Sequence, residues 1–229
     1  MVETDTIDDY IIKHIDEEGE YLHKLWRATQ IHLLYGRMAS GHLQGRMLKM
    51  FTQMIKPRLV LEIGTYSGYS GLCIAEGLAE VAKETADVKN GTAERGSIHH
   101  LHTIEINDEQ EDFTLPWFQN SPYSDLITMH IGDALEVIPQ LGLNYDMAFI
   151  DGDKRLYCEY FELVLKHITP GGYILADNTL WDGHVIETDS HDAQTLGIQA
   201  FNDLVAKDPR VETVILPLRD GLTILKKKQ

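Results

Sequence analysis

The sequence predicts an α/β fold, in which a doubly wound, mostly parallel sheet carries helices on both faces. Short apolar runs alternate with amphipathic segments from residue 59 onward, which is typical of parallel strands joined by helices. Polar, glycine-containing motifs follow several of these runs, at the strand ends where such sheets bind ligands. The last two runs are separated only by the turn residues Arg219-Asp220-Gly221, so we expect them to pair antiparallel, because parallel strands need a longer crossover.

The elements follow in a regular order along the chain. Residues 5–56 read as helical, with an apolar stripe at spacings of three and four formed by Leu43, Met47, Met50, Phe51 and Met54. Strands are expected at 59–63, 98–106, 126–131, 145–150, 173–176, 211–216 and 222–225. Helices are expected at 68–78, 108–118, a short segment ending at 138, 157–168 and 196–206. The polar segment 83–97 is expected to be a mobile surface loop.

Composition restricts the functional classes. The chain has 229 residues, of which 43% are hydrophobic and 24% charged, and is expected to form a single domain, 1–229, with residues 1–56 as a helical cap. Its formal net charge of −16 disfavours nucleic acid and anionic lipid as partners. Cys73 and Cys158 fall in expected helices, as buried thiols of a reducing compartment do. Without a signal core or a long apolar run, a cytoplasmic protein that does not cross a membrane is expected.

A glycine-rich turn follows the first expected strand. Leu61 to Ser70 (LEIGTYSGYS) reads as a strand end, a turn and the start of a helix. Gly64 and Gly68 let the backbone approach a ligand closely, and the helix start offers free N–H groups to an anion. The spacing differs from the Gly-x-Gly-x-x-Gly of NAD-binding proteins, and a turn that binds no ligand is the alternative.

Glu105 favours a nucleoside ligand at this turn. It ends the second expected strand, where a carboxylate can accept hydrogen bonds from both hydroxyls of a ribose. A solvated carboxylate is the alternative, and the preceding glycine turn favours the ribose role. Gly132-Asp133-Ala134 ends the third strand and is expected to meet an adenine edge or, through Asp133, to cap the next helix.

Two further strand ends carry oxygen-bearing side chains. Asp151-Gly152-Asp153-Lys154 ends one strand, and Asp177-Asn178 ends another. Oxygen ligands are preferred by hard divalent cations, so this is a candidate site for Mg²⁺, with Mn²⁺ or Ca²⁺ as alternatives. Asp177 and Asn178 can reach one ion only if the chain leaves the strand there, because strand neighbours point to opposite faces. Alternatively these residues are helix caps and turn residues, and Lys154 forms a surface ion pair with Asp153.

With these motifs in this order, the chain resembles the cation-dependent class I S-adenosylmethionine O-methyltransferases, which include the catechol and caffeoyl-CoA O-methyltransferases and their bacterial relatives. The resemblance covers about residues 35–225 and rests on residues 61–70, 103–105, 132–134, 149–160, 176–181 and 217–224. It implies a seven-stranded Rossmann-like sheet with an antiparallel last strand. It also implies S-adenosylmethionine and a divalent cation as cofactors and, by analogy, a homodimer.

The resemblance implies roles position by position. Metal ligands are implied at Asp151, Asp177 and Asn178, and a catalytic base at Lys154. Cofactor contacts are implied at Ser40, Glu62, Gly64, Thr65, Ser70, Glu105, Ala134 and Asp153, with Tyr66 and Ser67 in the same loop and Asp133 beside Ala134. The family usually has alanine where this chain has Gly152 between the two aspartates.

These roles describe transfer of a methyl group from S-adenosylmethionine to a small aromatic acceptor with neighbouring hydroxyls. A cation would lower the pKa of a bound phenol and orient it. Lys154, beside that cation, is expected to lose its proton more readily than a free lysine and to accept the phenol proton. Trp181, just after the metal ligands, is expected in the acceptor pocket.

Alternatives from other classes remain. An NAD-type oxidoreductase lacks its glycine fingerprint here, and a non-catalytic adenosyl-binding module would not need Lys154 and three metal ligands. The cluster His99-His100-x-His102 raises a zinc hypothesis, but alternate strand positions give only two ligands per face, so packing or solvated histidines are expected. Tyr157 and Tyr160 share a core-facing stripe, with stacking on a substrate as the alternative.

Overall fold

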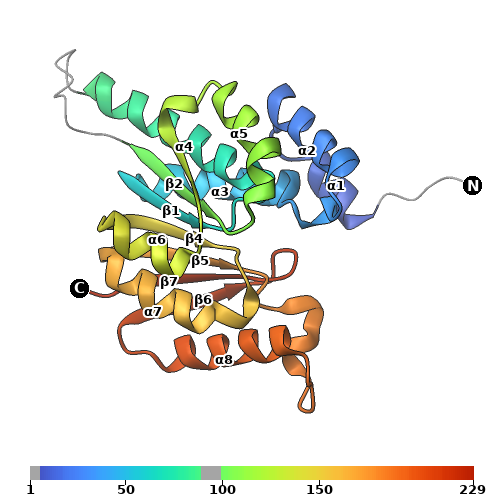
Figure 1. The fold of residues 1–229 in the computed structure, drawn as a ribbon, viewed down its shortest axis with the longest axis vertical. Helices are drawn as coiled ribbons and strands as arrows, with labels where there is room; N and C mark the ends of the chain where they lie inside the picture. Colours follow the sequence, from blue (N-terminus) through green and yellow to red (C-terminus); the bar gives the residue numbers. More distant parts are fainter. Residues whose placement is uncertain (1–5, 89–98) are drawn as a thin grey trace, which may run out of the picture.

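A seven-stranded sheet forms the centre of the computed structural model, which describes residues 6–88 and 99–229 (Figure 1). Its strands are β1 (Leu59–Ile63), β2 (His100–Glu105), β3 (Ile127–Ile131), β4 (Tyr145–Ile150), β5 (Ile168–Asp177), β6 (Val211–Leu216) and β7 (Leu222–Lys227). They lie in the order β3-β2-β1-β4-β5-β7-β6. All pairings are parallel except those of β7 with β5 and with β6, which confirms the predicted fold class and its antiparallel last strand.

The strand order reverses at β1. This strand pairs with β2 on one side and β4 on the other, so the chain extends in opposite directions from it. Ligands bind beyond the carboxyl ends of the strands at such a point. Gly64 directly follows β1 and Asp151 directly follows β4, so two of the predicted motifs meet there.

Helices cover both faces of the sheet (Figure 1). One face carries α3 (Gly41–Ile55), α4 (Tyr69–Val88) and α5 (Glu111–Gln119), and the other carries α6 (Ala134–Leu141), α7 (Tyr157–His167) and α8 (Ala193–Lys207). Two buried clusters result. Val60 packs with Leu72 in the first, and Leu61 packs with Phe161 in the second. Neighbouring β1 residues serve opposite clusters because successive strand side chains point to opposite faces.

The N-terminal region is helical but interrupted. It consists of α1 (Ile7–Lys13), α2 (Glu20–His32), a short 3₁₀ helix (Gly36–Met38) and α3. The expectation of helix throughout residues 5–56 is therefore wrong in detail. Gly19, at φ 83°, separates α1 from α2, and Leu33 is extended at the end of α2.

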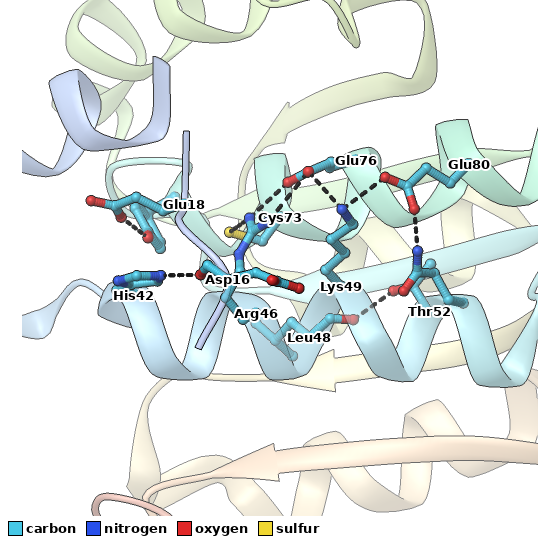
Figure 2. Close-up of polar contacts among 12 residues, drawn as sticks. Asp16, Glu18, His42, Arg46, Leu48, Lys49, Thr52, Cys73, Glu76 and Glu80 are labelled. Atoms are coloured by element: carbon cyan, nitrogen blue, oxygen red, sulfur yellow. Dashed lines mark hydrogen bonds and ion pairs between the residues drawn. The ribbon is translucent and has the colours of Figure 1, made fainter. Parts of the chain in front are cut away.

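Helix α3 is fixed to α4 by a network of ion pairs (Figure 2). Glu76 accepts from Arg46 Nη2 at 2.7 Å and from Lys49 Nζ at 2.8 Å, and Lys49 also contacts Glu80 at 2.7 Å. The helices approach so closely that a Cβ at Gly77 would lie 2.7 Å from Thr52. This packing places the start of α3 near the carboxyl edge of the sheet.

Several element boundaries differ from the predictions, most of all the end of α4 and the start of β5. Helix α4 continues to Val88, so residues 83–88 of the expected loop are helical, and residues 89–97 lie outside the described part of the chain. The reason is composition, because Lys, Glu and Ala in this segment are good helix formers. Strand β5 begins at Ile168 rather than residue 173, and Pro170-Gly171-Gly172 makes an irregularity within it instead of preceding it. Among the described residues no helix is long and apolar enough to cross a bilayer.

Candidate functional site

The ends of β1 and β4 touch directly. The Asp151 amide donates to the Ile63 carbonyl at 2.8 Å. Gly64 has φ 97°, and a Cβ there would lie 2.2 Å from the Asp151 carbonyl oxygen. The glycine turn and the first acidic motif are therefore parts of one site, and only glycine fits between them.

Lys154 lies in the interior of this site. It is 7% exposed, and its Nζ donates to Asp151 Oδ1 and to Tyr157 Oη, each at 2.8 Å. Tyr157 Oη donates in turn to the Asp177 carbonyl at 2.9 Å, which joins the end of β4 to that of β5. The alternative of a surface ion pair between Lys154 and Asp153 is wrong. Asp153 instead pairs with Arg155, whose Nε lies 2.9 Å from Asp153 Oδ1.

The surroundings of Lys154 favour its protonated form. Burial by itself lowers the pKa of Lys154, but the charge of Asp151 and contact with Tyr157 raise it overall. This rise in the pKa of Lys154 is opposite to the expected easier loss of its proton. That expectation concerns a lysine beside a bound cation. Tyr157 is fully buried and Tyr160 is 4% exposed, so both belong to the core-facing stripe of α7.

Asp177 and Asn178 occupy the end of β5. The chain leaves the strand as predicted, because Asn178 is left-handed at φ 57° and its amide donates to Asp177 Oδ1 at 2.9 Å. Burial raises the pKa of Asp177 to about 6, and the negative charge of Asp151 adds to the rise. A buried carboxylate whose pKa is raised by a neighbouring carboxylate, followed in the chain by Asn178, supplies the kind of oxygen donors that fit a hard divalent cation.

Glu105 is oriented by the glycine turn. Its Oε2 accepts from the Tyr66 amide at 2.8 Å and its Oε1 from the Asn107 amide at 2.9 Å. Tyr66 is itself left-handed, at φ 46°. Because a carboxylate oxygen has two lone pairs, each Glu105 oxygen keeps one for a further donor. The side chain is 8% exposed, and its oriented oxygens can accept hydrogen bonds from the hydroxyl groups of a ligand.

Other predicted cofactor residues line the same edge. Four of them are buried, namely Ser40, Thr65, Ser67 and Ser70, and Thr65 Oγ1 lies 2.6 Å from Thr103 Oγ1. Glu62 is fully buried, and burial raises the pKa of its carboxyl to about 7.

The two predictions for Asp133 differ in outcome. Its Oδ1 accepts from the Leu135 amide at 2.8 Å, so it caps α6, and Ala134 begins that helix. The adenine contact of this segment stays a prediction.

Gly152 has a packing reason that the sequence does not reveal. A Cβ at this position would lie 2.9 Å from the Tyr160 ring and 3.1 Å from Ile63. The alanine usual in the family would therefore crowd Tyr160 in this chain.

Two residues of the site were absent from the sequence-based predictions. Gln44 Nε2 donates to Asp177 Oδ2 at 2.7 Å, and Arg219 Nη1 donates to Gln44 Oε1 at 2.7 Å. No local pattern signals them, because the contacts join residues 133 and 175 positions apart. Trp181 is partly buried against the core, left-handed at φ 47°, and its role in an acceptor pocket is untested.

The histidine cluster is a packed group. His102 Nδ1 lies 3.0 Å from His130 Nε2, and its ring contacts the rings of His100 and His130 with centroids 5.0 and 5.3 Å apart. In residues 6–88 and 99–229, no three His, Cys, Asp or Glu side chains are arranged to hold a metal. The ring contacts agree with the expectation that these histidines pack against one another.

We expect this cluster to make folding stability depend on pH. Burial lowers the pKa of His102 from 6.5 to about 4, and His100 and His130 add to the fall. Because the folded pKa is the lower one, the unfolded chain binds more protons below pH 6.5, so stability is full above that value and declines toward pH 4. After allowance for partial exposure of the ring, protonation of His102 should lower the free energy of unfolding by on the order of 1–2 kcal/mol between pH 6.5 and pH 4.

Urea unfolding of His102→Gln at about pH 7.5 and about pH 5 tests this. The variant should lose less stability on acidification than the wild type, while substitution of the exposed His191 by Gln should leave the wild-type dependence intact. An identical pH dependence in His102→Gln and the wild type would contradict the assignment.

Comparisons with known proteins agree on one family. The family model described as O-methyltransferase matches residues 13–228. The chain is 30% identical over 241 residues to caffeoyl-CoA O-methyltransferase 2 of Zea mays, covering 99% of this chain and 84% of that protein.

Two solved structures with sequence identity of 26% share the fold. The O-methyltransferase TomG from Streptomyces achromogenes, in complex with SAM, has a TM-score of 0.83 over 97% of this chain and 96% of its own. The O-methyltransferase from Bacillus cereus, in complex with SAH, has a TM-score of 0.80 over 97% of each chain. The chain therefore belongs to the O-methyltransferase family that includes the caffeoyl-CoA O-methyltransferases.

Proposed function

We propose that this O-methyltransferase transfers the methyl group of S-adenosylmethionine to one hydroxyl of a small vicinal dihydroxy aromatic, with the help of a divalent cation. The observation that carries the proposal is the grouping of Asp151, Lys154 and Asp177 through Tyr157 at the ends of β4 and β5. This grouping would supply a base beside candidate cation ligands, as methyl transfer to a phenol requires.

The cofactor side of the proposal rests on Glu105 and the glycine turn. Each Glu105 oxygen is held by one backbone amide and keeps a lone pair for a ribose hydroxyl. The SAM and SAH in the two bacterial structures named above support an adenosyl ligand at this edge. The net charge of −16 also suits a cationic sulfonium.

Asp151, Asp177 and Asn178 would hold the cation through oxygen atoms. When bound there, Mg²⁺, Mn²⁺ or Ca²⁺ would act as a Lewis acid that lowers the pKa of a phenol. Lys154 Nζ would accept the phenol proton, the phenolate oxygen would form a bond to the methyl carbon, and the bond from that carbon to sulfur would break. This role needs the neutral amine, so Asp151 and Tyr157 must stabilise the ammonium less during reaction than in this structure.

The test is a methylation assay with labelled S-adenosylmethionine and a panel of catechols, with and without EDTA. We expect methylated product, its loss in EDTA, and recovery when excess Mg²⁺ is added. Product formation that EDTA leaves unchanged would overturn the cation requirement. Binding of NADH but not of S-adenosylhomocysteine, measured by calorimetry, would favour the oxidoreductase alternative instead.

The homodimer is part of the same proposal, by analogy with relatives only. Light scattering after size exclusion tests it, and a mass near 26.0 kDa would identify a monomer.

A further inference from the structure

Gln44 connects the start of α3 to the end of β5. It is 2% exposed, and both ends of its amide have partners: Nε2 donates to Asp177 Oδ2 and Oε1 accepts from Arg219 Nη1, each at 2.7 Å. We propose that Gln44, oriented by Arg219, is a positioning residue that fixes the Asp177 carboxylate for cation binding. The inference rests on the proposed function, in which Asp177 is a cation ligand.

Arg219 determines which way the amide faces. A guanidinium can only donate, so Gln44 must present its oxygen to Arg219 and its NH₂ group to Asp177. A flipped amide would set donor against donor at Arg219 and acceptor against acceptor at Asp177. Gln44 and Asp177 are only 2% and 4% exposed, so a flip would leave the Gln44 oxygen facing an Asp177 oxygen, with little water to replace the lost hydrogen bond.

The hydrogen bond from Gln44 completes the orientation of Asp177. Oδ2 accepts from Gln44, and Oδ1 accepts from the Asn178 amide at 2.9 Å. A carboxylate held at both oxygens cannot rotate about its last bond without losing one of them. Asp177 is 4% exposed, so water offers little replacement, and the remaining lone pairs keep a fixed direction.

The position of Arg219 is itself set by the turn between β6 and β7. Arg219 is left-handed at φ 49°, and its Nη1 also donates to the Ser40 carbonyl. The same turn holds the chain that follows Asn178, because the Thr179 amide donates to the Gly221 carbonyl at 3.0 Å. One turn therefore fixes both sides of Asp177, through Gln44 and through the chain after Asn178.

Binding of Mn²⁺ tests the inference without turnover. Gln44→Met keeps the volume and burial but removes the donor to Asp177. We expect Mn²⁺ affinity, measured by electron paramagnetic resonance in the presence of S-adenosylhomocysteine, to fall about 10- to 100-fold, as is usual when a partner of a metal ligand is lost. The affinity for S-adenosylhomocysteine should stay near wild type, whereas the melting temperature should fall, because Asp177 Oδ2 and Arg219 Nη1 each lose a partner.

Gln53→Met is the matched control. Gln53 lies on the same helix and its Nε2 also donates to a carboxylate, that of Glu80, away from Asp177. It should leave Mn²⁺ affinity unchanged. Arg219→Met leaves Gln44 in place but frees its amide to rotate, so it should also weaken Mn²⁺ binding. If Gln44→Met fails to fold, Arg219→Met tests the positioning role in its place.

The outcomes distinguish the positioning role of Gln44 from the cation site itself. Wild-type Mn²⁺ affinity in both Gln44→Met and Arg219→Met would overturn the positioning role alone, as would an equal loss in Gln53→Met. If the wild type binds S-adenosylhomocysteine but no Mn²⁺, the proposed cation site fails and the inference with it. A loss of Mn²⁺ affinity confined to the Gln44 and Arg219 variants supports both.

Discussion

Replacing Lys154 with methionine is expected to lower the turnover number by about 10²- to 10⁴-fold, the usual contribution of general acid–base catalysis. Methionine preserves the length and burial of the side chain but cannot accept a proton. Because Lys154 contacts Asp151 and Tyr157 and has no contact with the glycine turn, the affinity for S-adenosylhomocysteine should be retained. Single-turnover kinetics and calorimetry measure the two quantities separately.

Lys166→Met is the control for a lost lysine. This lysine is exposed on α7, the helix that follows Lys154, and its replacement should leave turnover unchanged. The ammonium of Lys154 also offsets the charges of the partly exposed Asp151 and the buried Asp177, so the melting temperature must be compared. Wild-type turnover in Lys154→Met would remove the lysine from catalysis, whereas parallel losses of turnover, cofactor affinity and melting temperature would indicate a structural role.

Gly64→Ala is expected to destabilise the fold by on the order of 2–4 kcal/mol and to abolish binding of S-adenosylhomocysteine. Two effects add. The backbone has φ 97°, which L-residues rarely adopt, and the new Cβ would lie 2.2 Å from the Asp151 carbonyl oxygen. Relief requires β1 and β4 to separate where the cofactor turn meets the acidic motif. Urea unfolding and calorimetry measure the two consequences.

Gly171→Ala distinguishes the clash from the backbone cost. Gly171 has φ 82°, yet a Cβ there would meet nothing within 4 Å beyond its chain neighbours, so this variant carries only the left-handed cost of about 1–2 kcal/mol. It lies within β5, before the strand reaches Asp177, so binding of S-adenosylhomocysteine should persist. Equal destabilisation in both variants would mean that the close approach of Gly64 to Asp151 adds nothing to the loss of stability in Gly64→Ala.

Much of the fold follows from local patterns. The apolar runs predicted at residues 59–63, 145–150 and 211–216 are strands with the same bounds in the structure. The short turn before β7 correctly predicted an antiparallel pair. Boundaries were less well predicted where local preferences compete, as in α4, which runs beyond residue 78 through a polar but helix-favouring segment.

The site was predictable as a set of strand ends but not as a set of contacts. Sequence placed Lys154 beside both Asp151 and Asp153, and either could have been its partner. The structure pairs it with Asp151, because Asp153 caps the short 3₁₀ helix that begins at Lys154 and binds Arg155. That choice depends on the direction in which the chain leaves β4.

The sequence by itself determined the order of the elements, the parallel sheet and the positions of the glycine turn and the two acidic motifs. These depend on periodicity and on residues a few positions apart, which a single chain displays directly. Only the tertiary structure decided that Gln44 and Arg219 reach Asp177, that Gly64 contacts Asp151, and that His130 joins His102. These contacts join segments far apart in the chain, and they arise from helix packing and strand order, which no local pattern encodes.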